Sequence, residues 1–325
     1  PLNAHVLSDS NTPLQSHFRE DIAQEMLEIV RFLAENECPF TINIYPFLSL
    51  VDDKSDYAFF DRRASPLTDG EPSYSNVFDA TYDALVVSLT KAGYSNMSII
   101  VGEIGWPTDG HVRANATNAL RFNQGFVNHM LSQGGTLLRP NTSIHFYLSS
   151  LIDEDLRSID TGSFERHWGM LRYDGVWKYA LSLSGSSKST RAPVSVHGVS
   201  YLPKQWCVLN TDVVDTSTLP DSMSYACANA DCTALGFGCS CSPYLDDVGN
   251  ASYAFNAYYQ RRDQQMGSCS FDGLGHIVTI DPSTNASCPF MIQIAHATSS
   301  RTMKAQNIQA IVGLCPLLFF IMVLL

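Results

Sequence analysis

The sequence is poor in positive charge. Its 325 residues include 20 Lys and Arg against 32 Asp and Glu, which gives a formal net charge of −12. Because no basic stripe is available to neutralise phosphates, we expect no nucleic acid among the partners of this protein. Hydrophobic residues make up 45% of the chain, so two domains with a sizeable core are possible. A neutral polymer or a small solute is a more suitable partner for this acidic composition than nucleic acid.

Histidine is sparse, and the first part of the chain has almost no cysteine. The nine histidines are scattered and no cysteine spacing resembles zinc ligands, so we expect no metal and no cofactor. Seven of the nine cysteines fall between Cys207 and Cys288, which is typical of a disulfide framework formed outside the cytosol. The spacing leaves their pairing open. Sequons for N-glycosylation, which also favour secretion, stand at Asn96, Asn115, Asn141, Asn250 and Asn285.

The C-terminal end of the sequence has the pattern of a processing signal, and the N-terminal end has none. No Met and no signal peptide precede Pro1, which predicts a mature form or a fragment. Small residues and a polar spacer precede an apolar stretch over 308–325, the order of a GPI-attachment signal, which we place at 294–325. A transmembrane helix is the alternative, but the stretch is short and contains Pro316. We therefore expect a secreted monomer held at the plasma membrane by a GPI lipid.

Strand and helix patterns alternate in the first part of the chain. Apolar spacing predicts strands at the start of the chain and at 40–45, 99–104 and 143–148, and helices at 16–36, 76–92, 114–133 and 177–183. Such alternation predicts right-handed βαβ units and a parallel sheet. One interpretation is a small doubly wound domain. The other, which we favour, is an α/β fold that forms the C-terminal half of a (β/α)8 TIM barrel over residues 1–184.

The rest of the chain differs in composition. Residues 185–203 are rich in Ser and predict a flexible linker. The cysteine-rich residues 204–293 then predict a small disulfide-rich α+β module.

A lone carboxylate, Glu103, ends an apolar run that predicts a strand buried on both faces. Burial of an unpaired carboxylate is costly, so we expect Glu103 at the mouth of a cleft, although a surface salt bridge is the alternative. Trp106 follows closely, and an aromatic platform beside a carboxylate suits sugar chemistry.

These residues resemble a known family. The segments at 43–47 and 102–107 are similar to plant endo-β-1,3-glucanases of glycoside hydrolase family 17, and further matches extend to about Leu183. The resemblance implies a (β/α)8 barrel and a retaining hydrolase of callose-like β-1,3-glucan. It makes Glu103 the nucleophile and places Glu154, Arg157 and Glu165 in a supporting role at the cleft. It also implies substrate-binding positions, which are Asn43, Tyr45, Trp106 and Asn123.

One element of the family pattern is missing. The general acid of the family lies in a Gly-Asn-Glu motif that this sequence does not contain, and Ile104 replaces the usual Thr after the nucleophile. Glu154 is a possible substitute, but an acidic residue next to Arg157 more often forms an ion pair. The sequence therefore predicts a fragment that lacks its general acid and is inactive as it stands.

The cysteine-rich module resembles a family 43 carbohydrate-binding module. The resemblance implies the disulfides Cys207–Cys269, Cys227–Cys232 and Cys241–Cys288, with Cys239 as an extra, free or exchanging cysteine. Among the aromatics of its central helix, we expect exposed Tyr253 or Tyr258 to stack on glucan and Phe255 and Tyr259 to be core.

Three functions are compatible with these features. The first is a GPI-anchored glucan endo-1,3-β-glucosidase of the plant cell wall. The second is a non-catalytic β-1,3-glucan-binding wall protein. The third is a structural surface glycoprotein without sugar specificity. The sequence leaves open the preferred chain length and linkage, the anchor site and the glycosylated sequons.

Overall fold

The computed structural model describes residues 1–295 apart from 9–11, 50–54, 62–66, 69–72 and 184–192. Most of the predicted GPI signal and the first half of the predicted linker lie outside these described residues. Within them, no helix is both long and apolar enough to cross a membrane.

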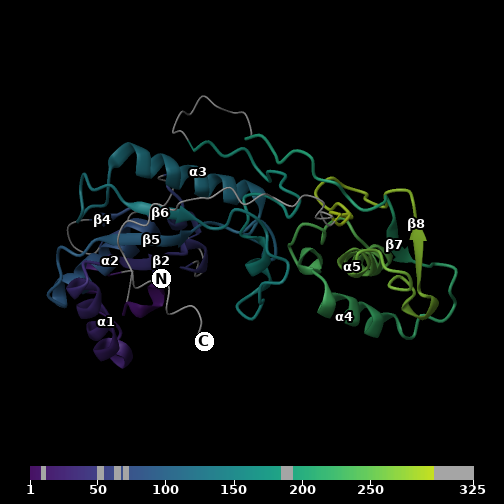
Figure 1. Ribbon diagram of the computed structural model, residues 1–325, viewed down its shortest axis with the longest axis horizontal. Coiled ribbons are helices and arrows are strands. Elements are labelled where there is room, and N and C mark those ends of the chain that lie inside the picture. Colours follow the sequence, from purple (N-terminus) through teal and green to yellow (C-terminus); the bar gives the residue numbers. More distant parts are fainter. Residues whose placement is uncertain (9–11, 50–54, 62–66, 69–72, 184–192, 296–325) are drawn as a thin grey trace, which may run out of the picture. The chain divides into compact units, whose positions relative to one another are not determined.

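A four-stranded parallel sheet forms the centre of the first part of the chain (Figure 1). Its strands, in spatial order, are β1 (Leu2–Asn3), β2 (Phe40–Asn43), β5 (Ile99–Ile104) and β6 (His145–Leu148). Each neighbouring pair is parallel. The carboxyl ends of parallel strands meet at one edge of a sheet, so the end of β5 lies beside the loops that follow β2 and β6.

Three helices connect these strands, as the alternating pattern predicts: α1 (Ala23–Glu35), α2 (Val77–Lys91) and α3 (Ala116–Gln133). Asn76 and Asn115 cap α2 and α3, because each side chain accepts a hydrogen bond from a backbone N–H in the first turn. The first helix begins later than predicted, because Phe18 forms an antiparallel bridge with Leu7. A short antiparallel pair, β3 (Leu67–Thr68) and β4 (Ser73–Tyr74), precedes α2.

The predicted helix at 177–183 is wrong. The described residues of this segment are not helical, and Trp177 forms an antiparallel bridge with Leu171. Tyr179 and Leu181 are buried while their neighbours are half-buried. This alternation has the period of an extended chain and not that of a helix.

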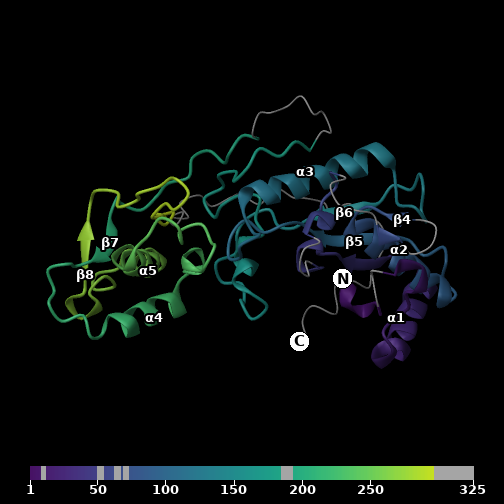
Figure 2. The ribbon, with the colours of Figure 1, turned by 180° about the vertical axis from the view of Figure 1, so that it is seen from behind.

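The cysteine-rich part contains an antiparallel pair, β7 (Trp206–Leu209) and β8 (Gly275–Val278), and two helices, α4 (Leu219–Asn229) and α5 (Asp247–Arg261) (Figure 2). Its disulfides are Cys207–Cys269, Cys227–Cys232 and Cys241–Cys288, the pairs that the resemblance implies. Cys239 is a buried free thiol.

Candidate active site

Glu103 lies near the carboxyl end of β5 and is half-buried. Its backbone carbonyl accepts a hydrogen bond of 2.9 Å from Ile44, which fixes β5 against the end of β2. The side-chain Oε2 accepts a short hydrogen bond from the hydroxyl of Tyr45. Among the described residues, the carboxylate is therefore neither free on the surface nor paired with a cation, which differs from the surface salt bridge that the sequence left open.

Tyr45 meets Glu103 through its hydroxyl, while its ring packs against Trp168 at 5.0 Å between ring centroids. Burial raises the pKa of Tyr45 well above its ordinary value, and the hydrogen bond to Glu103 raises it further. The phenol thus stays protonated and donates to the carboxylate. This geometry suits a residue that orients Glu103, whereas the sequence predicts a stacking ring; its contact with sugar stays a prediction.

Arg157 links the other predicted carboxylates of the site. Its Nε lies 3.0 Å from Glu165 Oε2, and its guanidinium lies 3.5 Å from Glu154. Glu165 also accepts hydrogen bonds from Thr161 and from the Trp168 indole. The Glu165 side chain is 11% exposed and that of Glu154 is 56% exposed. Glu165 is therefore firmly held, and Glu154 is a weak, solvent-screened partner.

Glu103 on β5, Tyr45 in the loop after β2, and Arg157 and Glu165 in the loops after β6 meet at one edge of the sheet. The Arg157 guanidinium faces the Tyr45 hydroxyl and counteracts the effect of Glu103 on the pKa of Tyr45. The resulting sequence of contacts runs from Glu103 through Tyr45 and Arg157 to Glu165. A carboxylate with an oriented hydrogen-bond donor and a nearby cation is suited to nucleophilic attack.

The prediction that Trp106 is a sugar-stacking platform is wrong. Its side chain is 1% exposed and its Nε1 donates a 3.0 Å hydrogen bond to the Arg113 carbonyl. The rings of Phe47, Phe59 and Phe122 lie against it at 4.6–5.3 Å between centroids. Because the indole is enclosed by aromatic neighbours, it stabilises the core behind Glu103 and has no face open to a ligand.

The two predicted asparagines differ. Asn123 is 2% exposed and donates a 2.7 Å hydrogen bond to the Tyr179 hydroxyl, so its assignment to the cleft is wrong. Asn43 is half-buried, and its Oδ1 has no hydrogen-bond partner among the described residues. That oxygen lies against Gly102, where a side-chain Cβ would sit only 2.6 Å from it. Asn43 therefore stays a predicted substrate contact beside Glu103.

A hollow of about 240 Å³ opens beside Tyr45. Its lining is mixed polar and apolar and comes mainly from the carboxyl ends of β1 and β2; it includes Asn3, His5, Ile44, Tyr45, Leu48 and Ser49. A pocket of this kind at the carboxyl ends of parallel strands is where such folds bind ligands.

The predicted sugar-binding tyrosines of the module are not exposed. Tyr258 is 9% exposed and packs on Tyr225 and Phe271, so its prediction as an exposed ligand contact is wrong. Tyr253 is half-buried against Phe290 and is not exposed either. Helix α5 therefore uses its aromatic rings chiefly as core, the alternative that the sequence left open.

Another part of the module offers an open aromatic ring. A hollow of about 270 Å³ is lined by Tyr244, Asp246, Pro282, Thr284 and Phe290, and Tyr244 is 44% exposed. The Cys241–Cys288 disulfide joins the two loops that form it.

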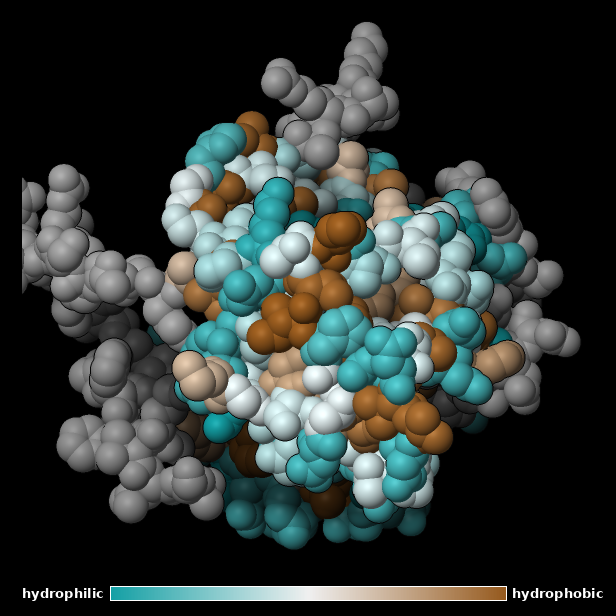
Figure 3. All heavy atoms as spheres, turned by 90° about the vertical axis from the view of Figure 1, so that its right-hand side faces the viewer, coloured by the Kyte–Doolittle hydropathy of each residue, from teal (hydrophilic) through white to brown (hydrophobic). Residues whose placement is uncertain are grey.

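Figure 3 shows one face of the molecule, on which apolar residues lie in small groups between polar ones.

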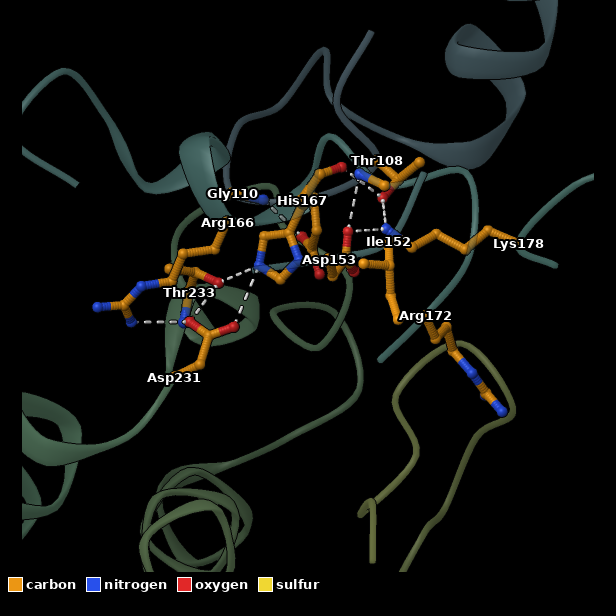
Figure 4. A network of polar contacts seen from close by, with 12 residues as sticks. Thr108, Gly110, Ile152, Asp153, Arg166, His167, Arg172, Lys178, Asp231 and Thr233 are labelled. Carbon is orange, nitrogen blue, oxygen red and sulfur yellow. Dashed lines mark hydrogen bonds and ion pairs between the residues drawn. The ribbon is translucent and has the colours of Figure 1, made fainter. Parts of the chain in front are cut away.

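A buried ionic network that sequence reasoning missed surrounds His167 (Figure 4). His167 Nδ1 lies 3.6 Å from Asp153, and its Nε2 lies 3.3 Å from Asp231 of the module. Lys178 Nζ lies 2.5 Å from Asp153. Burial alone lowers the pKa of His167, but the two aspartates outweigh it and raise the pKa to about 9. His167 and Asp231 are distant in the chain, so no local sequence pattern links them.

The side chains of the described residues also bear on metal binding. The described part of the chain contains no group of three or more His, Cys, Asp or Glu side chains arranged to hold a metal ion.

Comparisons with known proteins give two family matches. The family described as glycosyl hydrolases family 17 matches residues 1–183, and the X8 domain matches residues 205–276.

Two similar relatives are from Arabidopsis thaliana. Glucan endo-1,3-beta-glucosidase 5 is 49% identical over 92% of this chain and 62% of its own length. Glucan endo-1,3-beta-glucosidase 8 is 47% identical over 92% of this chain and 63% of its own length. The chain thus spans less than two thirds of the length of these relatives.

Solved structures resemble part of the chain. CJP38, a beta-1,3-glucanase and allergen of Cryptomeria japonica pollen, is 33% identical with a TM-score of 0.53, and the match covers 56% of this chain and 57% of CJP38. A plant beta-glucan endohydrolase is 29% identical with a TM-score of 0.50 over 55% of this chain and 58% of its own. These comparisons confirm the expected fold class, part of a (β/α)8 barrel followed by a small disulfide-rich module.

Proposed function

The chain belongs to glycosyl hydrolase family 17, and from that premise we propose that it carries the nucleophile of a retaining endo-β-1,3-glucanase. The observation that carries the proposal is the position of Glu103 at the carboxyl end of β5, hydrogen-bonded to Tyr45 and facing the loop of Arg157 and Glu165. The names of the relatives, which are glucan endo-1,3-beta-glucosidases, support β-1,3-glucan as the substrate.

In the proposed reaction, the Glu103 carboxylate attacks the anomeric carbon and displaces the glycosidic oxygen. A covalent glycosyl-enzyme forms, and water then hydrolyses it with retention of configuration. The Tyr45 hydroxyl holds the attacking carboxylate in orientation, and Arg157 with Glu165 fixes Tyr45 from the other side.

Retaining hydrolysis also needs a general acid about 5 Å from the nucleophile. Glu154 and Glu165 are both ion-paired with Arg157, so their carboxylate oxygens are already engaged with a guanidinium. We therefore assign the acid to neither residue. We propose that it comes from the part of the barrel that the relatives contain and this chain does not span.

The module at 204–293 is proposed to bind the same glucan and raise its concentration at the cleft. We infer that the sugar contacts the hollow at Tyr244, because this ring is exposed while Tyr253 and Tyr258 are packed in the module. The three disulfides support a secreted protein. Monomeric state and GPI attachment at the plasma membrane and cell wall belong to the same proposal, as do the domain boundaries at 184 and 203.

The test is laminarin hydrolysis by the protein extended upstream to the length of its relatives. Replacement of the nucleophile, Glu103→Gln, is expected to lower kcat by about a thousandfold or more. The matched control Glu154→Gln, which changes an exposed carboxylate, is expected to keep most of the activity. NMR of the first product anomer checks retention.

Two results would overturn the proposal. Full activity of Glu103→Gln would exclude the nucleophile. An extended wild type that binds laminarin without cleaving it would favour the alternative, a non-catalytic β-1,3-glucan-binding wall protein.

A further inference from the structure

We propose that the disulfide module docks on the loops after β5 and β6 through the ionic network of His167, so that module and catalytic cleft form one fixed unit. The functional consequence rests on the proposed glucanase activity, but the docking itself does not. Residues Pro1–Ala295 form one compact unit in which these contacts lie.

Asp231 is the centre of the module's side of this interface. Its carboxylate lies 3.3 Å from His167 Nε2 and 3.2 Å from the Arg166 guanidinium (Figure 4). It also accepts two hydrogen bonds from Thr233, whose hydroxyl bonds His167 in turn. One aspartate of the module is thus bound by two adjacent cations of the barrel part.

A second polar contact joins the module to the loop after β5. The backbone N–H of Ser240 donates a 3.0 Å hydrogen bond to Asp109, and the Ser240 hydroxyl donates to the other oxygen of that carboxylate. A third contact is the 2.5 Å hydrogen bond from the Tyr173 hydroxyl to the Ile292 carbonyl. Three separate points of attachment fix both position and orientation, which a flexible tether alone does not.

The charges of the interface are largely buried and balanced. The side chains of His167, Lys178, Asp153 and Asp231 are between 10% and 24% exposed. If the module separated, Asp153 would keep its ion pair with Lys178, but Asp231 would lose its ion pair with His167. A buried charge that loses its partner is strongly unfavourable, so the interface resists partial opening.

The same interface reaches the candidate active site. Arg166, which Asp231 binds, donates a 3.2 Å hydrogen bond to the carbonyl of Arg157 and accepts one at its own carbonyl from Glu154. Glu165 precedes Arg166 in the chain and pairs with Arg157. Docking therefore holds the loop that positions Arg157 next to Tyr45 and Glu103.

The network also gives the interface a pH dependence with a defined sign. Four charged groups surround His167, namely Asp153, Lys178, Asp231 and Arg166. The half-buried Tyr253 of α5 is also near, and the charge of Asp231 adds to the effect of burial in raising the pKa of Tyr253. The pKa of His167 is raised from 6.5 to about 9 in the folded protein. The attraction is therefore complete below about pH 6.5 and is lost as the pH rises through about 9.

Hydrogen–deuterium exchange on the full chain tests the docking without any glucan. The isosteric variant Asp231→Asn is expected to raise exchange at least about tenfold in 106–114, 153–168 and 231–241, with α5 unchanged as the internal sign of a folded module. The control Asp221→Asn removes an exposed aspartate of α4 and is expected to change none of these segments. Unchanged exchange in Asp231→Asn on both sides of the interface would overturn the proposal.

A second variant covers the case in which Asp231→Asn unfolds the module. His167→Gln alters the barrel side only, and it is expected to abolish the rise in exchange, taken relative to the intrinsic base-catalysed rate of unprotected amides, that the wild type shows between pH 8 and about pH 10. A wild type without that rise would overturn the ionic link. Laminarin kcat in the extended protein is expected to fall about threefold to tenfold in either variant with KM little changed. Loss of docking without loss of kcat would refute the effect on the cleft and leave the proposed function intact.

Discussion

The barrel part and the module reach stability by different means. The barrel part packs a large core in which Trp106, Phe122 and Phe126 are at most 1% exposed, and no disulfide joins its described residues. The module has a much smaller core around Phe255 and Tyr259 and three disulfides. The difference follows from size, because a small domain buries too little apolar surface to fold without cross-links.

The two parts also differ in how each holds a shielded aspartate. Asp83 is fully buried in the barrel part with hydroxyl and amide donors, and burial raises its pKa to about 6. Asp231 of the module is also shielded, yet the hydrogen bond and charge of His167 outweigh burial and lower its pKa well below the ordinary range. A cationic partner thus decides which buried acid stays ionised.

The largest effect is expected from Trp106→Ala, which removes an enclosed ring from the aromatic core. Loss of packing is expected to cost about 3–5 kcal/mol of unfolding free energy in the barrel part. Calorimetry should show a lower unfolding transition for that part. Phe237→Ala, which removes a ring that is 94% exposed, is the control and should leave that transition unchanged.

The next effect tests the cross-links of the module. The double variant Cys241→Ser with Cys288→Ser opens a loop whose ends are 47 residues apart, for an expected loss of about 4 kcal/mol. Urea unfolding of the module should shift to a lower urea concentration. The matched control Cys239→Ser removes the free thiol; a loss of similar size there would contradict the assignment.

A smaller effect is expected on catalysis from Tyr45→Phe in the protein extended upstream. The ring and its packing on Trp168 remain, but Glu103 loses its hydrogen-bond donor. We expect laminarin kcat to fall by about ten- to a hundredfold, since one hydrogen bond to a charged group is worth about 1.5–3 kcal/mol. Unchanged kcat would show that Tyr45 does not orient the carboxylate.

The smallest effect concerns the module's hollow. Tyr244→Ala is expected to weaken laminarin binding about threefold to tenfold, because one exposed aromatic face is lost. Affinity electrophoresis in laminarin gels measures it. Tyr225→Ala, which removes another exposed ring from α4, should leave binding unchanged; the reverse pattern would move the sugar contact to that helix.

The predicted strands and the helices at 76–92 and 114–133 were found close to their expected ranges, because their apolar periodicity is strong and local. The segment at 177–183 failed because a short apolar run fits both periods, and only its bridge to Leu171 selects the extended form. Trp106 and Asn123 failed for another reason: a motif marks a residue near the site without saying which way its side chain points.

The sequence by itself determined the order of strands and helices, the cysteine-rich module and Glu103 at the end of a buried strand, since these follow from periodicity, composition and short motifs. Only the tertiary structure decided that Tyr45 turns its hydroxyl to Glu103, that Trp106 and Tyr258 are core, and that Asp231 meets His167. Such contacts join residues far apart in the chain, and side-chain direction and partner depend on packing that no local pattern encodes.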